Sequence, residues 1–169
     1  MGWGCAILDP NGEPLGSIFG GLPGSRQAVP RGELWALIQL LQRTSGDLTV
    51  AVDAAYTTKG HSRGPAWAHQ GNHDLWATYW ATVGSRAGTV TLLKVKSHIR
   101  LEALPAAEAG RELAYRANQA ADAAACAGAL AAALPSHVCR EVEQVDAKAW
   151  RVQKRLLACL LYTSDAADE

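Results

Sequence analysis

The strongest constraint on the fold of this chain is the order in which strand-like and helix-like segments follow one another. Residues 3–7 alternate apolar and small side chains, which is typical of a strand. Residues 9–12, Asp-Pro-Asn-Gly, are a turn signal, so residues 15–19 are expected to complete a hairpin. Apolar residues at helical spacing then follow Pro30 and stop before Gly46, which predicts a helix of about 15 residues.

The remainder of the chain continues this alternation. A short, continuous apolar run predicts a buried parallel strand at residues 48–52. The further expected elements are a short helix at 54–59, a loop at 60–72, a helix at 73–83, a strand at 89–95, an alanine-rich helix at 105–134 and a last helix at 138–158. The order strand–strand–helix–strand–helix–strand–helix predicts an α/β fold with a hairpin first and parallel strands after it.

Composition narrows the class of protein. A chain of 169 residues is one domain or two, and 49% apolar with 19% charged residues excludes a disordered, collagen-like or coiled-coil composition for the chain as a whole. No apolar run reaches the length of a membrane span, and no basic, apolar leader opens the chain, so we expect an intracellular protein that is neither secreted nor membrane-bound. The four cysteines lack metal-site spacing and are expected to be buried free thiols.

The end of the chain has a different character. Residues 159–169, Cys-Leu-Leu-Tyr-Thr-Ser-Asp-Ala-Ala-Asp-Glu, resemble the translation of a transposase adapter used to prepare sequencing libraries. A genuine polar tail is the alternative. We therefore divide the chain into a main domain at 1–134, an extra helical segment at 135–158 and a non-native tail at 159–169.

Three acidic residues occupy notable positions. Glu33 is expected in the first turn of its helix, Asp53 at the end of a strand and Asp122 on the alanine-rich helix, with His98 just after the last strand. Each acid has an ordinary explanation by itself: a favourable charge at a helix N-terminus, a helix N-cap and a surface acid, respectively. Together, acids at strand ends and on facing helices can converge on hard divalent cations such as Mg²⁺.

Two such cations can activate a water molecule and stabilise a leaving oxygen in phosphoryl transfer. A neighbouring histidine such as His98 can then move protons or help the product to leave. The acids therefore indicate a metal-dependent nuclease as one function of this chain.

Six segments of the chain, in order, resemble type-1 ribonuclease H, particularly the form found in retroelement polyproteins. They are Gly-Trp-Gly-Cys-Ala-Ile-Leu at 2–8, Gln-Ala-Val-Pro-Arg-Gly-Glu-Leu-Trp-Ala-Leu at 27–37, Val-Ala-Val-Asp-Ala-Ala-Tyr at 50–56, Asn-His-Asp-Leu-Trp at 72–76, Lys-Val-Lys-Ser-His at 94–98 and Asn-Gln-Ala-Ala-Asp at 118–122. The resemblance implies a mixed five-stranded sheet with helices on both faces. It also implies Mg²⁺-dependent hydrolysis of the RNA strand of an RNA/DNA hybrid, with Mn²⁺ as an alternative ion.

The resemblance assigns roles residue by residue. It implies that Glu33, Asp53 and Asp122 are catalytic, metal-binding carboxylates and that His98 is a mobile catalytic histidine. It implies contacts to the nucleic acid from Lys59, Lys94, Lys96, Arg100 and Asn118. The implied partner is an RNA/DNA hybrid, and the implied context is a larger retroelement polyprotein.

One departure from the family pattern matters most. The family has a fourth carboxylate, an aspartate at the end of a first strand that precedes the Gly-Trp-Gly segment, whereas here Gly2 follows Met1. Asp9 lies in the turn at the far end of the strand and cannot substitute. Three interpretations stay open: a ribonuclease H domain that lacks its first strand, a degenerate module that binds hybrid or duplex without cleaving it, and an unrelated α/β domain.

Overall fold

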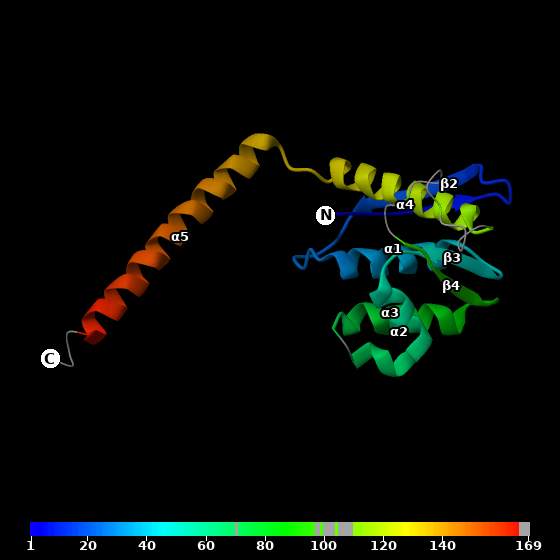
Figure 1. Ribbon diagram of the computed structural model, residues 1–169, viewed down its shortest axis with the longest axis horizontal. Coiled ribbons are helices and arrows are strands. Elements are labelled where there is room, and N and C mark those ends of the chain that lie inside the picture. The colour runs from blue at the N-terminus through cyan, green and yellow to red at the C-terminus, as the bar shows by residue number, and fades with distance from the viewer. Residues whose placement is uncertain (70, 97–98, 100–103, 105–109, 166–169) are drawn as a thin grey trace. The chain divides into compact units, whose positions relative to one another are not determined.

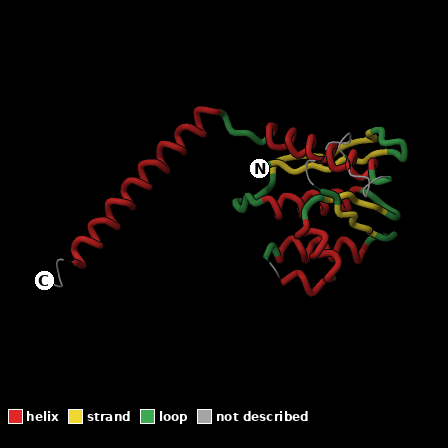
Figure 2. Tube along the Cα trace, viewed as in Figure 1, coloured by secondary structure: helices red, strands yellow, loops and turns green. Residues whose placement is uncertain are grey.

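The computed structural model describes residues 1–69, 71–96, 99, 104 and 110–165. It divides into unit 1, Met1–Ala132, and unit 2, Ala133–Glu169. Figures 1 and 2 show that unit 1 holds all the described strands together with helices α1 to α4, and that unit 2 is built on a single helix, α5. Because helices and strands alternate through unit 1, the predicted α/β class is confirmed.

The predicted hairpin forms the start of unit 1. Strands β1 (Gly2–Leu8) and β2 (Pro14–Gly21) pair antiparallel, with Cys5 opposite Ile18. The Asp9 carboxylate accepts the backbone N–H groups of Asn11 at 2.9 Å and of Glu13 at 2.8 Å. These two hydrogen bonds hold the turn, as the short side chain of aspartate commonly does.

A hydrophobic core joins two helices to the second pair of strands. Helix α1 (Val29–Arg43) packs on α3 (His73–Ser85), and strands β3 (Leu48–Val52) and β4 (Val90–Lys94) pair parallel, as predicted. The buried core consists of Leu34, Leu37, Ile38, Leu41, Leu75, Trp76 and Tyr79. Its α1 members recur three and four residues apart, which places them on one face of that helix.

Helix α4 (Glu112–Ala131) lies unusually close to the hairpin, and glycines allow this approach. A Cβ atom added to Gly4 would stand 2.4 Å from the backbone nitrogen of Ala125. A Cβ added to Gly128 would stand 2.6 Å from the carbonyl oxygen of Gly20. The Gly-Trp-Gly segment therefore lets the backbone of α4 rest on β1, which also brings the middle of α4 toward α1 and β3.

The strands form two separate two-stranded sheets, β1–β2 and β3–β4. The resemblance implied one mixed sheet, and within the described residues no strand pairs β1 with β3. Among the residues that the structure describes, each of these two strands consequently has one edge without a neighbouring strand. Such an edge carries backbone donors and acceptors that a further strand can satisfy.

Several predicted element bounds were wrong. Helix α2 (Ala55–Arg63) runs four residues beyond the predicted end at Lys59, and the expected loop after it contains the 3-10 helix η1 (Pro65–His69). Helix α4 begins at Glu112 and ends at Ala131, inside the predicted range 105–134, of which residues 105–109 lie outside the described residues. The expectation of four buried cysteines was wrong for three of them: Cys5 is buried, whereas Cys126, Cys139 and Cys159 are exposed on their helices.

Unit 2 is dominated by helix α5 (Ser136–Asp165), which extends seven residues beyond the predicted end at Ala158 and into the segment that resembles an adapter. Most of its side chains are exposed. In the described part of the chain, no single helix is both long and apolar enough to cross a membrane. Helices α4 and α5 meet that test of length and composition only when they are counted together across the break between them.

Candidate functional site

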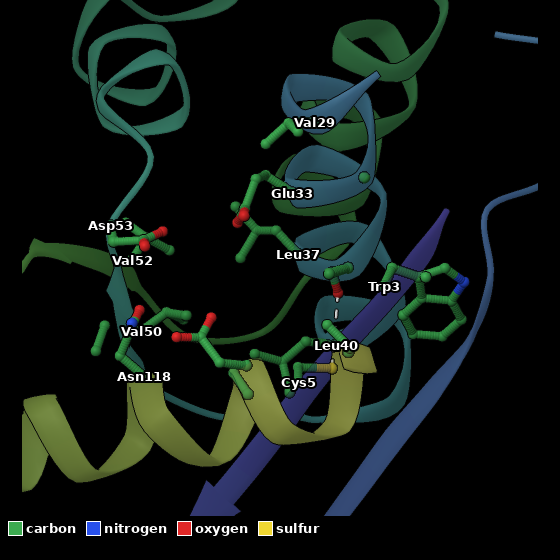
Figure 3. Close-up of a pocket in the computed structure, with 18 of the residues that line it drawn as sticks. Trp3, Cys5, Val29, Glu33, Leu37, Leu40, Val50, Val52, Asp53 and Asn118 are labelled. Carbon is green, nitrogen blue, oxygen red and sulfur yellow. Dashed lines mark hydrogen bonds between the residues drawn. The ribbon is translucent and has the colours of Figure 1, made fainter. Parts of the chain in front are cut away.

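The three acids singled out in the sequence line one pocket of unit 1. Glu33 comes from α1, Asp53 from the residue after β3 and Asp122 from α4, and all three line a cavity of about 160 Å³. Figure 3 shows the carboxylates of Glu33 and Asp53 pointing toward one another across this pocket. Segments that are far apart in the sequence thus bring their acids to one place.

The electrostatics of the pocket act most strongly on Glu33. Burial raises the pKa of Glu33 to about 7, and repulsion from the carboxylates of Asp53 and Asp122 contributes to this increase. Glu33 and Asp53 are half-buried, whereas Asp122 is exposed. A carboxyl group with such a raised pKa is only partly ionised near neutral pH. A cation that neutralises the three acids would lower the pKa of Glu33 again.

The structure removes two ordinary explanations for these acids. Helix α1 begins at Val29 and has no acid in its first turn, so the prediction that Glu33 lies in that turn was wrong. Asp53 does not cap α2, because the N-cap residue is Ala54 and no side chain caps that helix by a hydrogen bond. Neither acid is therefore explained by the start of a helix.

The donor set of the pocket suits a hard cation, because carboxylate oxygens are the ligands that Mg²⁺ prefers. Within the described residues, however, no group of three or more His, Cys, Asp or Glu side chains is close enough to hold a metal ion. The three acids face one pocket, and the charges of Asp53 and Asp122 raise the pKa of Glu33, but the acids do not form a ready-made ligand cluster. A cation would have to draw their side chains together.

Asn118 and Lys94 lie beside the acids in different ways. Asn118 is buried on α4 and lines the acidic pocket (Figure 3). The ammonium group of Lys94 donates to the backbone carbonyl oxygens of Asp53, at 2.5 Å, and Val95, at 2.6 Å. Lys94 therefore holds the backbone of Asp53 at the end of β3.

Of the other predicted site residues, the two lysines that the structure describes do not line the pocket. Lys59 and Lys96 are exposed and do not line it. His98 and Arg100 lie outside the described residues. Asp9 is held in the hairpin turn and takes no part in the pocket, as the sequence predicted.

A second cavity between the two sheets shares the lining residues Cys5, Val50 and Ala51 with the acidic pocket. It measures about 390 Å³ and is lined by Cys5–Leu8 of β1 and residues 48–51 of β3, whereas the acidic pocket is lined by residues 1–5 and 50–53. Strands β1 and β3 therefore run in opposite directions on either side of this space. A strand placed between them would be antiparallel to β1 and parallel to β3, or the reverse.

Sequence reasoning missed the ion pair that fixes the start of α1. Arg31 binds the Asp74 carboxylate through both of its terminal nitrogens, at 3.0 and 2.5 Å, and this contact lowers the pKa of Asp74 to about 2. Asn72, which precedes α3, has a left-handed backbone with a φ of 48°. The opposite charges of Arg31 and Asp74 are visible in the sequence, but their separation by 43 residues gives no local signal of the pairing.

No protein-family model matches the chain, and no curated protein matches it. The resemblance to type-1 ribonuclease H rests on the six sequence segments, and ribonuclease activity stays a prediction.

Proposed function

We propose that unit 1 is a ribonuclease H-like domain that hydrolyses the RNA strand of an RNA/DNA hybrid with Mg²⁺, or with Mn²⁺ as the alternative ion. The observation that carries this proposal is the convergence of Glu33, Asp53 and Asp122, from three separate elements, on one pocket. The effect of Asp53 and Asp122 on the pKa of Glu33 supports it further, because the charges of both aspartates reach the Glu33 carboxyl group.

In this proposal the three carboxylates bind divalent cations, which supply charge stabilisation and water activation for phosphoryl transfer when they are bound. Glu33, with a pKa of about 7, gives up its proton as cations bind. Lys94 orients Asp53 by holding the backbone on which that carboxylate stands. Asn118 supports the wall of the pocket one helical turn before Asp122. Contacts from His98, Lys59, Lys96 and Arg100 to the hybrid remain part of the proposal.

The proposal includes a strand in the space between β1 and β3. The unpaired edges of the two described strands and the two cavities that both strands line support this addition. Antiparallel neighbours are joined by short hairpins, so a strand linked directly ahead of Gly2 would run antiparallel to β1 and parallel to β3. Its last residue would then lie at the Asp53 end of the cavity, where a fourth carboxylate would complete the acidic site.

The test compares the chain with a version that carries a strand of about six residues ending in aspartate, fused ahead of Met1 through a two-residue turn. Cleavage of a labelled RNA/DNA hybrid is followed while Mg²⁺ is titrated. The matched control ends the same strand in asparagine. We expect Mg²⁺-dependent cleavage by the aspartate form and a rate at least about 100-fold lower for the asparagine form.

Binding of the same hybrid, measured by fluorescence anisotropy at two salt concentrations, separates recognition from cleavage. Salt-sensitive binding without any cleavage by the aspartate form would show that the domain binds the hybrid but is not an enzyme. The absence of both binding and cleavage would leave an unrelated α/β domain as the remaining interpretation. Cleavage that persists in Asp53→Asn would contradict the site.

A further inference from the structure

Helix α5 of unit 2 carries an apolar face that covers nothing within that unit. Val142, Val145, Val152 and Leu156 have between 52% and 63% of their surface exposed. A lone helix gains little stability from its own hydrogen bonds, and helices in proteins are stabilised mainly by burying an apolar face. A partner that buries this face would therefore stabilise α5.

The spacing of the apolar residues specifies what kind of partner fits. Residues 138, 142, 145, 149, 152 and 156 are Val, Val, Val, Ala, Val and Leu, separated alternately by four and three residues. This is the heptad spacing that lets two helices supercoil with their apolar seams in contact. The seam lies in residues 138–156 and ends before the segment that resembles an adapter.

The charges on α5 specify the direction of the partner helix. The first half of the helix is acidic apart from Arg140, and the second half, up to Ala158, is basic throughout. The acids are Glu141, Glu143 and Asp146, and the bases are Lys148, Arg151, Lys154 and Arg155. A second copy of the helix laid antiparallel sets each acidic half against a basic half, whereas a parallel copy sets like charges together.

We propose that α5 pairs antiparallel with α5 of a second copy of this chain. With the pair centred on residue 147, Val138 meets Leu156 of the second copy and Val142 meets Val152 of the second copy. Glu141 then lies near Arg155 of the second copy, on the flank of the seam. The small side chain of Ala149 lets the two helices approach closely near the centre. This pairing is independent of the nuclease proposal, because it uses no residue of unit 1.

Sedimentation of the full chain over a range of concentrations tests the pairing. We expect a dimer that dissociates on dilution. The double variant Val145→Asp and Val152→Asp should weaken the dimer at least about tenfold, because it places four charges in the seam. The matched control is Ala147→Asp, which adds a charge on the opposite face of α5 and should leave the dimer intact.

Disulfide trapping tests the direction of the helices. In the antiparallel pair, Cys139 flanks residue 153 of the second copy. The variant Gln153→Cys is made in a background where Cys126 and Cys159 are replaced by serine. On oxidation, this variant should form a covalent dimer between Cys139 and the new cysteine of the second copy. The same background with Gln153 retained should form little covalent dimer. Efficient linkage through Cys139 alone would show a parallel pair and overturn the proposal.

Other outcomes also decide against it. A chain that stays monomeric at high concentration, or a dimer that the seam variants leave unchanged, would overturn the pairing. Loss of the dimer when the chain is ended at Ala158 would assign the association to the tail. Binding of monomeric chain to anionic lipid vesicles, lost in the seam variant, would identify a membrane surface as the partner.

Discussion

Asp53, at the end of β3, faces Glu33 on α1 and helps to raise the pKa of that carboxyl group to about 7 (Figure 3). Two acids held this way oppose folding when both are ionised, because burial and mutual repulsion disfavour the charged form. Such an arrangement is common where a protein binds cations or performs chemistry, and it is costly elsewhere.

Replacing Glu33 by glutamine should change how stability depends on pH. The pKa of Glu33 is raised from 4.5 to about 7 on folding, so the folded chain binds more protons between these values than the unfolded chain. The contribution of Glu33 to stability is therefore present below about pH 4.5 and is lost as the pH rises through about 7. We expect Glu33→Gln to be more stable than the natural sequence at pH 8, by up to about 3 kcal/mol.

Urea denaturation at pH 5 and at pH 8, without divalent cations, measures this difference. The control is Glu13→Gln, which removes an exposed acid on the hairpin. Its stability should follow that of the natural sequence at both pH values. An unchanged pH dependence in Glu33→Gln would show that the carboxyl group titrates normally.

Divalent cations should stabilise the chain through the acidic pocket. Mg²⁺ binds the folded state and relieves the repulsion among Glu33, Asp53 and Asp122, so the melting temperature should rise with Mg²⁺ concentration. Asp53→Asn should largely abolish this rise, and Glu13→Gln should keep it. The rise should also be smaller at pH 6 than at pH 8, because protons compete with the cation at Glu33. Equal Mg²⁺ responses in the two variants would refute a cation site at Asp53.

Substitution of Gly4 should disturb the contact between β1 and α4. A Cβ atom at Gly4 meets the backbone of Ala124 and Ala125 within 2.7 Å, so Gly4→Ala forces the helix away from the strand. We expect a loss of about 1–3 kcal/mol in the free energy of unfolding. Gly16, on β2, has no atom within 4 Å of an added Cβ and provides the matched control. Chemical denaturation should show a clearly lower free energy of unfolding for Gly4→Ala than for Gly16→Ala.

Lys94 should contribute to the structure around Asp53 more than its exposed neighbour Lys96 does. Lys94→Ala leaves the carbonyl oxygens of Asp53 and Val95 without the ammonium donor, and we expect a loss of about 1 kcal/mol in stability. Lys96→Ala should change stability by less than about 0.5 kcal/mol. Thermal unfolding of both variants measures this, and equal losses would remove the special role of Lys94.

The local elements could be read from the sequence because their signals are local. Strand 48–52 and the helix after Pro30 follow from residues that are neighbours in the chain, and both are present with nearly the expected bounds. The end of α2 was missed because Gly60, which signals a loop in the sequence, is accommodated inside the helix, where an added Cβ would meet Trp76 at 2.1 Å. That contact depends on α3, which lies further along the chain.

The candidate site was also predictable from the sequence only in part. The sequence identified Glu33, Asp53 and Asp122 as acids at notable positions, and it gave the alternation of elements that permits their convergence. Only the tertiary structure decided that they line one pocket, that Lys94 is bound to the Asp53 carbonyl and that β1 and β3 keep separate sheets with facing edges. Periodicity and turn residues fix secondary structure within a few residues, whereas pKa values and sheet edges depend on which distant segments pack together, as α4 does on Gly4.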